Sequence, residues 1–181
     1  MIELFLSKLK LFTRKKRPAH HGWTKFQVRR IDPKTGELGE WKDLSPFKRN
    51  VLTLGGRDYF HAQCYTNTVA GGTGANKIGV SNDTTQPPDE SHTSMLGEIT
   101  GSGMDRKVAS PAPSHVAGTN VSVMEATWTA TGTVNGICKV GTFTLLGPPV
   151  AGVLVHENIL DPSVSLVNTE QLRAVGTHNL G

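Results

Sequence analysis

The chain has 181 residues, of which 19% are charged and only 6% aromatic, and it contains 20 glycines and 10 prolines. This length suits one domain with an extension, and the many turn residues set among Val, Leu, Ile, Thr and Ser favour an all-β domain. The only cysteines, Cys64 and Cys138, are too few for the disulfide framework of a small secreted domain. A single bridge between them stays open, and two reduced thiols are the simpler interpretation.

The charge is divided unevenly along the chain. Residues 1–57 contain 14 of the 19 Lys and Arg but 5 of the 15 Asp and Glu. The net charge of +4 therefore combines a basic N-terminal third with an acidic remainder. This division indicates an arm that meets an acidic partner, either nucleic acid or an acidic protein surface, although a solvated face would give the same pattern.

Residues 1–22 are predicted to form a basic, amphipathic N-terminal arm. Apolar residues recur at helical spacing over residues 2–12, and the tract RKKR follows them. So short a helix is marginal alone, so we expect its apolar side to dock on its own domain or a neighbouring subunit, in preference to a lipid surface. Lysines interrupt the apolar run, which is shorter than the ~20 residues of a membrane span, so neither a signal peptide nor a span is expected. The predicted partner-binding residues of the arm are Ile2, Phe5, Leu9, Phe12, Arg14, Lys15, Lys16 and Arg17.

Residues 23–181 are predicted to form the β-domain, which begins with a hairpin over residues 23–45. The period changes to two at Trp23, and the stretch DPKTGE places Pro and Gly at turn positions. A short connector helix is expected at about residues 51–66, in the stretch LGGRDYFHAQCYTNT. Its predicted structural residues are Gly55 and Gly56 at its entry, Asp58 as a polar contact, and Tyr59 on its buried side.

Short strands are expected through the rest of the chain. They include KIGVS, MDRKVAS, VSVMEATWTATG, GICKVGTFTLL, AGVLVHENIL, VSLVN and QLRAVGTHNL. In the third of these, alternation places Trp128 with Met124 and Ala126 on one face, as a structural core residue. Strands at roughly ten-residue intervals predict an antiparallel β-sandwich or a barrel-like domain.

Residues capable of catalysis or metal binding are scattered. His61 and Cys64 would be neighbours on a helix, but no third group or oxyanion donor accompanies them, so a buried structural pair is the better interpretation. The adjacent histidines at 20 and 21 would point to opposite faces of a strand and make poor shared ligands. We therefore expect no catalytic residue, no metal and no cofactor.

Several loose motifs suggest a family. They are Asn50, Thr53, Gly56 and Asp58 in the pattern N-x-x-T-x-x-G-x-D, then Ile78 and Val80, then SMLGEI with Leu96, Glu98 and Ile99. In this order they resemble the small virion structural proteins of tailed bacteriophages, over roughly residues 23–181. The basic N-terminus is not part of that pattern.

The resemblance implies a non-enzymatic β-domain that is located in the virion and assembles with other virion proteins of the capsid, portal, collar or tail. Our expectation is a homo-oligomeric component that docks on capsid or neck through the arm and stabilises the particle. A tail or fibre-base protein with host-contacting loops is the first alternative. A nucleic-acid-binding protein acting through residues 8–30 is an alternative of another class, and nucleic acid is the less favoured partner.

Overall fold

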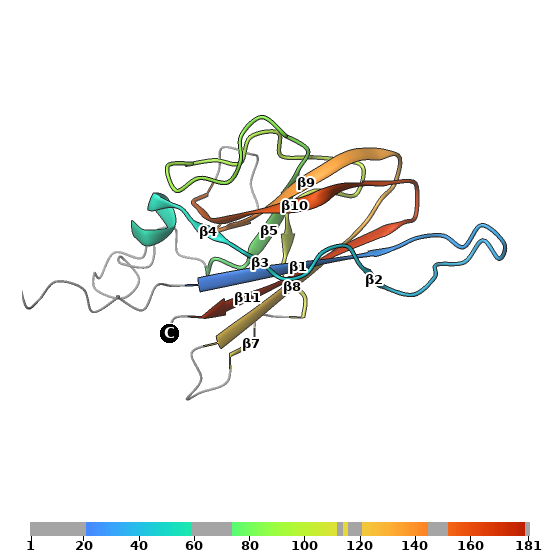
Figure 1. Ribbon diagram of the computed structural model, residues 1–181, viewed down its shortest axis with the longest axis horizontal. Helices are drawn as coiled ribbons and strands as arrows, with labels where there is room; N and C mark the ends of the chain where they lie inside the picture. The colour runs from blue at the N-terminus through green and yellow to red at the C-terminus, as the bar shows by residue number, and fades with distance from the viewer. Residues whose placement is uncertain (1–20, 59–73, 112–113, 116–120, 145–151, 180–181) are drawn as a thin grey trace, which may run out of the picture.

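The computed structural model describes residues 21–58, 74–111, 114–115, 121–144 and 152–179. These residues form two antiparallel sheets that enclose a common core, with one short helical segment (Figure 1). The prediction of a mainly β, antiparallel sandwich is therefore confirmed.

The first sheet has the strand order β2-β1-β11-β8-β7, and β3 also pairs with β1. Its three long strands, β1, β11 and β8, are paired over nine residues each, so that Trp23, Thr177 and Val123 lie in one row. The strands of this sheet are β1 (His21–Arg29), β2 (Lys42–Asp43), β3 (Lys48–Arg49), β7 (Ser114–His115), β8 (Val121–Thr129) and β11 (Gln171–Asn179).

The second sheet has the order β4-β10-β9-β5-β6. The chain crosses to it from the first sheet at Asn50, between β3 and β4, and returns before β7. Its strands are β4 (Val51–Leu52), β5 (Lys77–Ser81), β6 (Lys107–Val108), β9 (Val134–Phe143) and β10 (Leu154–Leu166).

The core lies between the two sheets and follows the period of two. Phe26, Trp128 and Leu172 contribute from the first sheet, and all three are fully buried. Val80 and Leu166 face them from the second sheet. The predicted alternation of β8 is confirmed, because Met124, Ala126 and Trp128 are buried while Val123 and Thr129 are exposed.

The predicted hairpin is present, but its returning strand is short. Val28 pairs with Lys42, and Ile31 bridges to Leu38 beside the turn. The turn of this hairpin projects from one end of the molecule (Figure 1).

The connector helix begins later than predicted. Residues 51–52 form β4, residues 54–58 are helical, and the remainder of the predicted range lies outside the described residues. Thr53 sets this start, because its side-chain oxygen accepts a hydrogen bond from the backbone N–H of Gly56 at 3.0 Å, as an N-cap does. Gly56 is required there, since a Cβ at this position would lie 2.3 Å from the carbonyl oxygen of Val155.

Other strand predictions need correction in extent. The stretch MDRKVAS contributes only the two residues of β6, and the two strands predicted in AGVLVHENIL and VSLVN form one strand, β10. The pairing register of β10 with β9 shifts between Ile159 and Val164, so the interruption at Asp161 and Pro162 is absorbed as an irregularity. The two-residue strands β3 and β7 were not predicted, because so short a pairing leaves no periodic signal.

Candidate functional site

The outer face of the second sheet is covered by the chain itself. Residues 82–106, here called the cover segment, arch over this sheet (Figure 1, green). Met95 of the cover segment packs with Phe143 and Leu154 in a small second core, in which each residue is at most 2% exposed. Apolar contacts within one chain therefore cover part of this face.

The cover segment contains a buried ion pair between two of its own residues. Glu98 accepts two hydrogen bonds from the Arg106 guanidinium, one of them 2.7 Å long, and both side chains are at most 2% exposed. The guanidinium also lies 3.6 Å from the centre of the Phe143 ring. Gly79 and Gly141 are paired beneath this cluster, and a Cβ on Gly79 would approach Glu98 Oε1 to 2.8 Å.

A second charged cluster lies on the same face. The Lys139 ammonium is 2.6 Å from Asp83 Oδ2 and donates to the backbone carbonyl of Gln86 at 2.8 Å. His92 Nδ1 lies 2.7 Å from Glu157 Oε2, and the Glu157 side chain is fully buried. The hydrogen bond from Lys139 holds the pKa of Asp83 well below its ordinary value.

A groove of about 260 Å³ opens beside Lys139, and Cys138, Pro87 and Ile159 lie along it. Burial raises the pKa of the Cys138 thiol, which donates to the Asp83 carbonyl at 3.1 Å. The thiol is therefore protonated near neutral pH, and the neighbouring ammonium is already bound. This arrangement suits a structural role better than nucleophilic catalysis.

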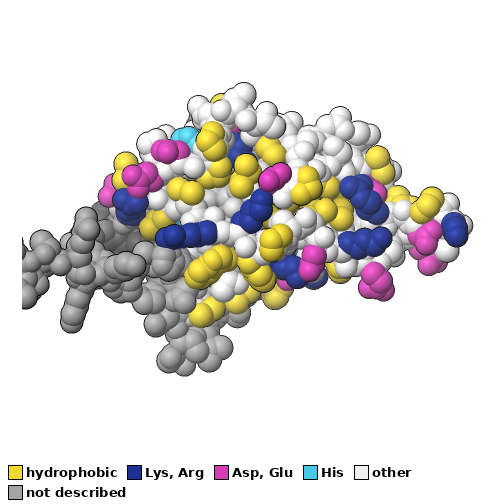
Figure 2. Space-filling model, viewed as in Figure 1, with side chains coloured by type: hydrophobic (Ala, Val, Ile, Leu, Met, Phe, Trp, Pro, Cys, Tyr) yellow, Lys and Arg dark blue, Asp and Glu magenta, His cyan; other side chains and the backbone are white. Residues whose placement is uncertain are grey.

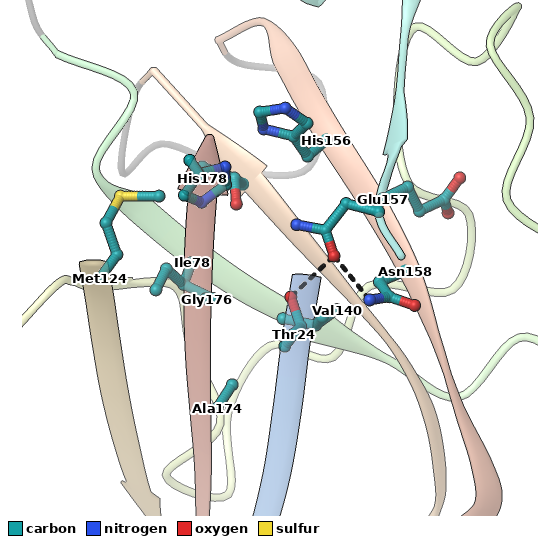
Figure 3. Close-up of a pocket in the computed structure, with 12 residues that line it drawn as sticks. Thr24, Ile78, Met124, Val140, His156, Glu157, Asn158, Ala174, Gly176 and His178 are labelled. Atoms are coloured by element: carbon teal, nitrogen blue, oxygen red, sulfur yellow. Dashed lines mark hydrogen bonds between the residues drawn. The ribbon is translucent and has the colours of Figure 1, made fainter. Parts of the chain in front are cut away.

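A second cavity lies between the two sheets and is lined by both polar and apolar side chains (Figure 3). Asn50 Oδ1 accepts hydrogen bonds from Thr24 at 2.8 Å and from Asn158 at 2.6 Å, which fixes the crossing between the sheets. The His156 and His178 rings lie 4.7 Å apart on facing strands, while Glu157 points away from the cavity. Its volume of about 10 Å³ holds about one water molecule, so it is no ligand pocket.

The outer face of the first sheet is different, and is here called the open face. Its side chains are half-buried or exposed, and they form four rows across β1, β11 and β8. From one end to the other, the rows are Trp23–Thr177–Val123, Lys25–Val175–Glu125, Gln27–Arg173–Thr127 and Arg29–Gln171–Thr129.

The open face is apolar at one end and charged at the other. Hydrophobic side chains gather over the start of β1 and β8 (Figure 2), where Val123 is 37% exposed. Toward the hairpin, the Arg173 and Arg29 guanidiniums lie 4.4 and 5.6 Å from the centre of the Trp41 ring. Trp and Arg are the residues that most often dominate protein–protein binding energy, so this face suits a protein partner.

Basic side chains bind to the backbone of β10 and β8, the strands next to the short edge strands β4 and β7. Lys48 donates to the carbonyl of Asp161 at 3.2 Å and Arg30 to that of Ser165 at 3.1 Å, along β10. Lys107 donates to the carbonyl of Thr127 at 2.9 Å, along β8. These contacts disfavour the addition of a further strand at these positions of β10 and β8.

The predicted site residues are only partly described. All eight arm residues and Tyr59 lie outside the described ranges, as does Cys64, while Cys138 is a free, buried thiol. Gly56 is buried, Gly55 is half-buried, and Asp58 is exposed. Trp128 is fully buried, and its indole N–H donates to the Asp105 carbonyl at 2.9 Å.

Two sets of residues escaped sequence reasoning. No sequence pattern singled out Lys139 or Arg106, and Glu98 was named only as part of a loose family motif, because burial of these charges depends on the path of the cover segment. Trp41 and Arg173 are 132 positions apart in sequence and meet only through strand pairing. The two-residue alternation did predict which β1 side chains share a face.

Comparison with family models, with curated proteins and with solved structures finds no match for this chain. In the described ranges, no group of three or more His, Cys, Asp or Glu is placed to hold a metal ion. The same residues include no helix that is long and apolar enough to cross a membrane.

Proposed function

We propose that this chain is a non-enzymatic structural protein of a tailed-phage virion. It docks on other virion subunits, of the capsid or the neck, through its N-terminal arm, and it stabilises the particle as a homo-oligomeric component. The observation that carries the proposal is the open face, which begins where the basic arm joins β1. The basic side chains bound along β10 and β8 and the cover segment over the second sheet favour association through this face and the arm.

The chemistry of the arm supports the same proposal. The tract Arg14–Arg17 offers four adjacent positive charges to an acidic subunit surface. Single contacts of this kind are weak at physiological ionic strength, but many copies on one lattice add through multivalency. A small β-domain repeated over a particle can therefore bind tightly without a large interface per copy.

The test compares two charge-removal variants during infection by the phage that carries the gene. Replacing Lys15 and Lys16 by Ser should strongly reduce co-sedimentation of the chain with purified particles. Replacing the exposed Lys34 and Lys42 by Ser removes the same charge from the hairpin and should leave co-sedimentation unchanged. Equal loss in both variants, or loss in neither, contradicts docking through the arm.

Location separates the main proposal from its alternative. Antibody labelling of intact particles at the capsid or neck supports the proposal. Labelling at the tail tip supports a tail or fibre-base protein instead, whose host-contacting loops are expected at residues 69–76 and 82–91.

A nucleic-acid-binding role is favoured only by the basic tract and the neighbouring aromatic residue Trp23. It predicts DNA binding at about 50 mM salt that weakens steeply by about 200 mM, because each neutralised phosphate releases counterions. A mobility-shift assay without binding at the lower salt concentration excludes this role.

A further inference from the structure

The apolar end of the open face lies where the N-terminal arm enters the domain. β1 begins at His21, and Trp23 stands in the same row as Thr177 and Val123. Val175 lies in the next row, between Lys25 and Glu125. The 20 residues that precede β1 lie outside the described part of the chain and join it at this end.

We infer that residues 2–12 of this same chain cover the apolar end of the open face in the free protein. The occupant is argued from the sequence pattern, since Ile2, Phe5, Leu9 and Phe12 form one apolar side at helical spacing. A helix of this length is marginally stable alone in water, so packing of its apolar side against the apolar end of the open face would stabilise it.

The dimensions fit this arrangement. The connecting residues 13–20 span at most about 26–29 Å when extended, at 3.3–3.6 Å for each residue. A helix of eleven residues is about 16 Å long, and three neighbouring strands are about 10 Å across. The segment can therefore turn back over β1, β11 and β8 without unfolding them.

Charge decides which half of the arm lies on the face. The far end of the face carries Arg29 and Arg173, which would repel the basic tract Arg14–Arg17. The apolar half is therefore placed on the face and the tract stays beside His21, where a partner can reach it. A second copy could offer the same segment, but the short tether gives the chain's own segment an effective concentration in the millimolar range.

Disulfide trapping tests the inference on the full chain. The variant Phe5→Cys/Val123→Cys, oxidised under dilute conditions and mapped by mass spectrometry, should form a link between positions 5 and 123 within one chain. Two matched controls should link several-fold more slowly. They are Lys8→Cys/Val123→Cys, which uses the polar side of the segment, and Phe5→Cys/Thr129→Cys, which uses the far end of the face.

Intermolecular linkage that rises with protein concentration would show a second copy as the occupant and overturn the inference. Equal linkage in all three variants, or in none, would overturn it too. A measurement without new cysteines keeps the test independent of their effect on folding. Deleting residues 1–12 should raise the fluorescence of an apolar dye, and Val123→Thr/Val175→Thr should suppress that rise; an unchanged signal after deletion contradicts the inference.

This inference does not rest on the virion role. Trapping within one chain can succeed while removal of charge from the arm leaves particle binding unchanged, and the reverse can also occur. The two results together show whether the apolar half and the basic half of the arm have separate tasks.

Discussion

The outer faces of the two sheets differ, because one is covered by the chain and the other is open. The second sheet hides charged and apolar side chains together beneath the cover segment, and Lys139, Glu157 and Arg106 all become buried there. The first sheet keeps its outer residues half-buried or exposed, from Trp23 and Val123 at one end to the charged residues at the other. The comparison separates a face that the described chain covers to stabilise itself from one whose side chains stay half-buried or exposed.

Ion pairs on the two faces should differ most in their effect on stability. Arg106→Leu leaves Glu98 buried without its partner, so the free energy of unfolding should fall by about 3–5 kcal/mol. On the open face, Glu125→Gln removes a pair with Arg173 whose side chains are 27% and 25% exposed. That change should cost about 1 kcal/mol or less in urea unfolding.

A double variant separates the lost ion pair from damage to packing. Arg106→Leu/Glu98→Leu removes both charges and should recover much of the loss, because no charge is then left buried alone. If the two single variants cost the same, the two faces do not differ as described.

Close packing beneath the cover segment gives the next largest effect. Gly79→Ala places a methyl group 2.8 Å from Glu98 Oε1 and 3.1 Å from the Arg106 side chain, so it should cost about 1–3 kcal/mol in thermal or urea unfolding. Gly132→Ala is the matched control, since its Cβ meets nothing closer than 4.0 Å. A neutral Gly79→Ala would show that the cover segment moves aside easily.

Acid should loosen the covered face through Asp83. The pKa of this carboxyl is lowered in the folded protein by its hydrogen bond from Lys139, whereas the unfolded chain takes up the proton near its ordinary pKa of about 3.9. Its contribution to stability is therefore complete above about pH 4 and is lost as the pH falls toward the folded-state pKa. The urea midpoint of the native protein should fall more steeply below pH 4 than that of Asp83→Asn, and parallel curves would contradict this coupling.

The smallest effect is expected at the charged end of the open face. Thr127→Val keeps a β-branched side chain on an outward position of β8, so stability should change by no more than about 0.5 kcal/mol. A loss of several times this size would mean that the far end of the face is also part of a core.

Sequence reasoning was strongest where one face of a strand is buried. The alternation in β1 and β8 predicted which side chains enter the core, and Trp128 is buried as expected. The glycine pair at 55 and 56 was predicted at the entry of the helix, although the predicted start at about residue 51 was too early. These features depend on neighbours in the chain, so the sequence carries them directly.

Features that depend on contacts between residues far apart in sequence could not be predicted. Whether Lys139 or Glu98 is solvated or buried depends on the path of residues 82–106, which have no periodicity and run through turns. The tight clustering of these buried charged side chains also requires that Gly79 and Gly141 lie opposite each other. That pairing is set by the register of the two strands. The open face could not be predicted either, because strand pairing brings residues from both ends of the chain into its rows.

The central claim is that the open face, and not the covered one, is the surface that residues 1–12 of the chain occupy in the free protein. Hydroxyl-radical footprinting of the full chain and of the chain without residues 1–12 tests it most directly, with three tryptophans as internal probes. Labelling of Trp23 should rise several-fold on truncation, while that of the buried Trp128 and Met95 stays unchanged. Unchanged labelling of Trp23, or a comparable rise at Met95 beneath the cover segment, would contradict the account.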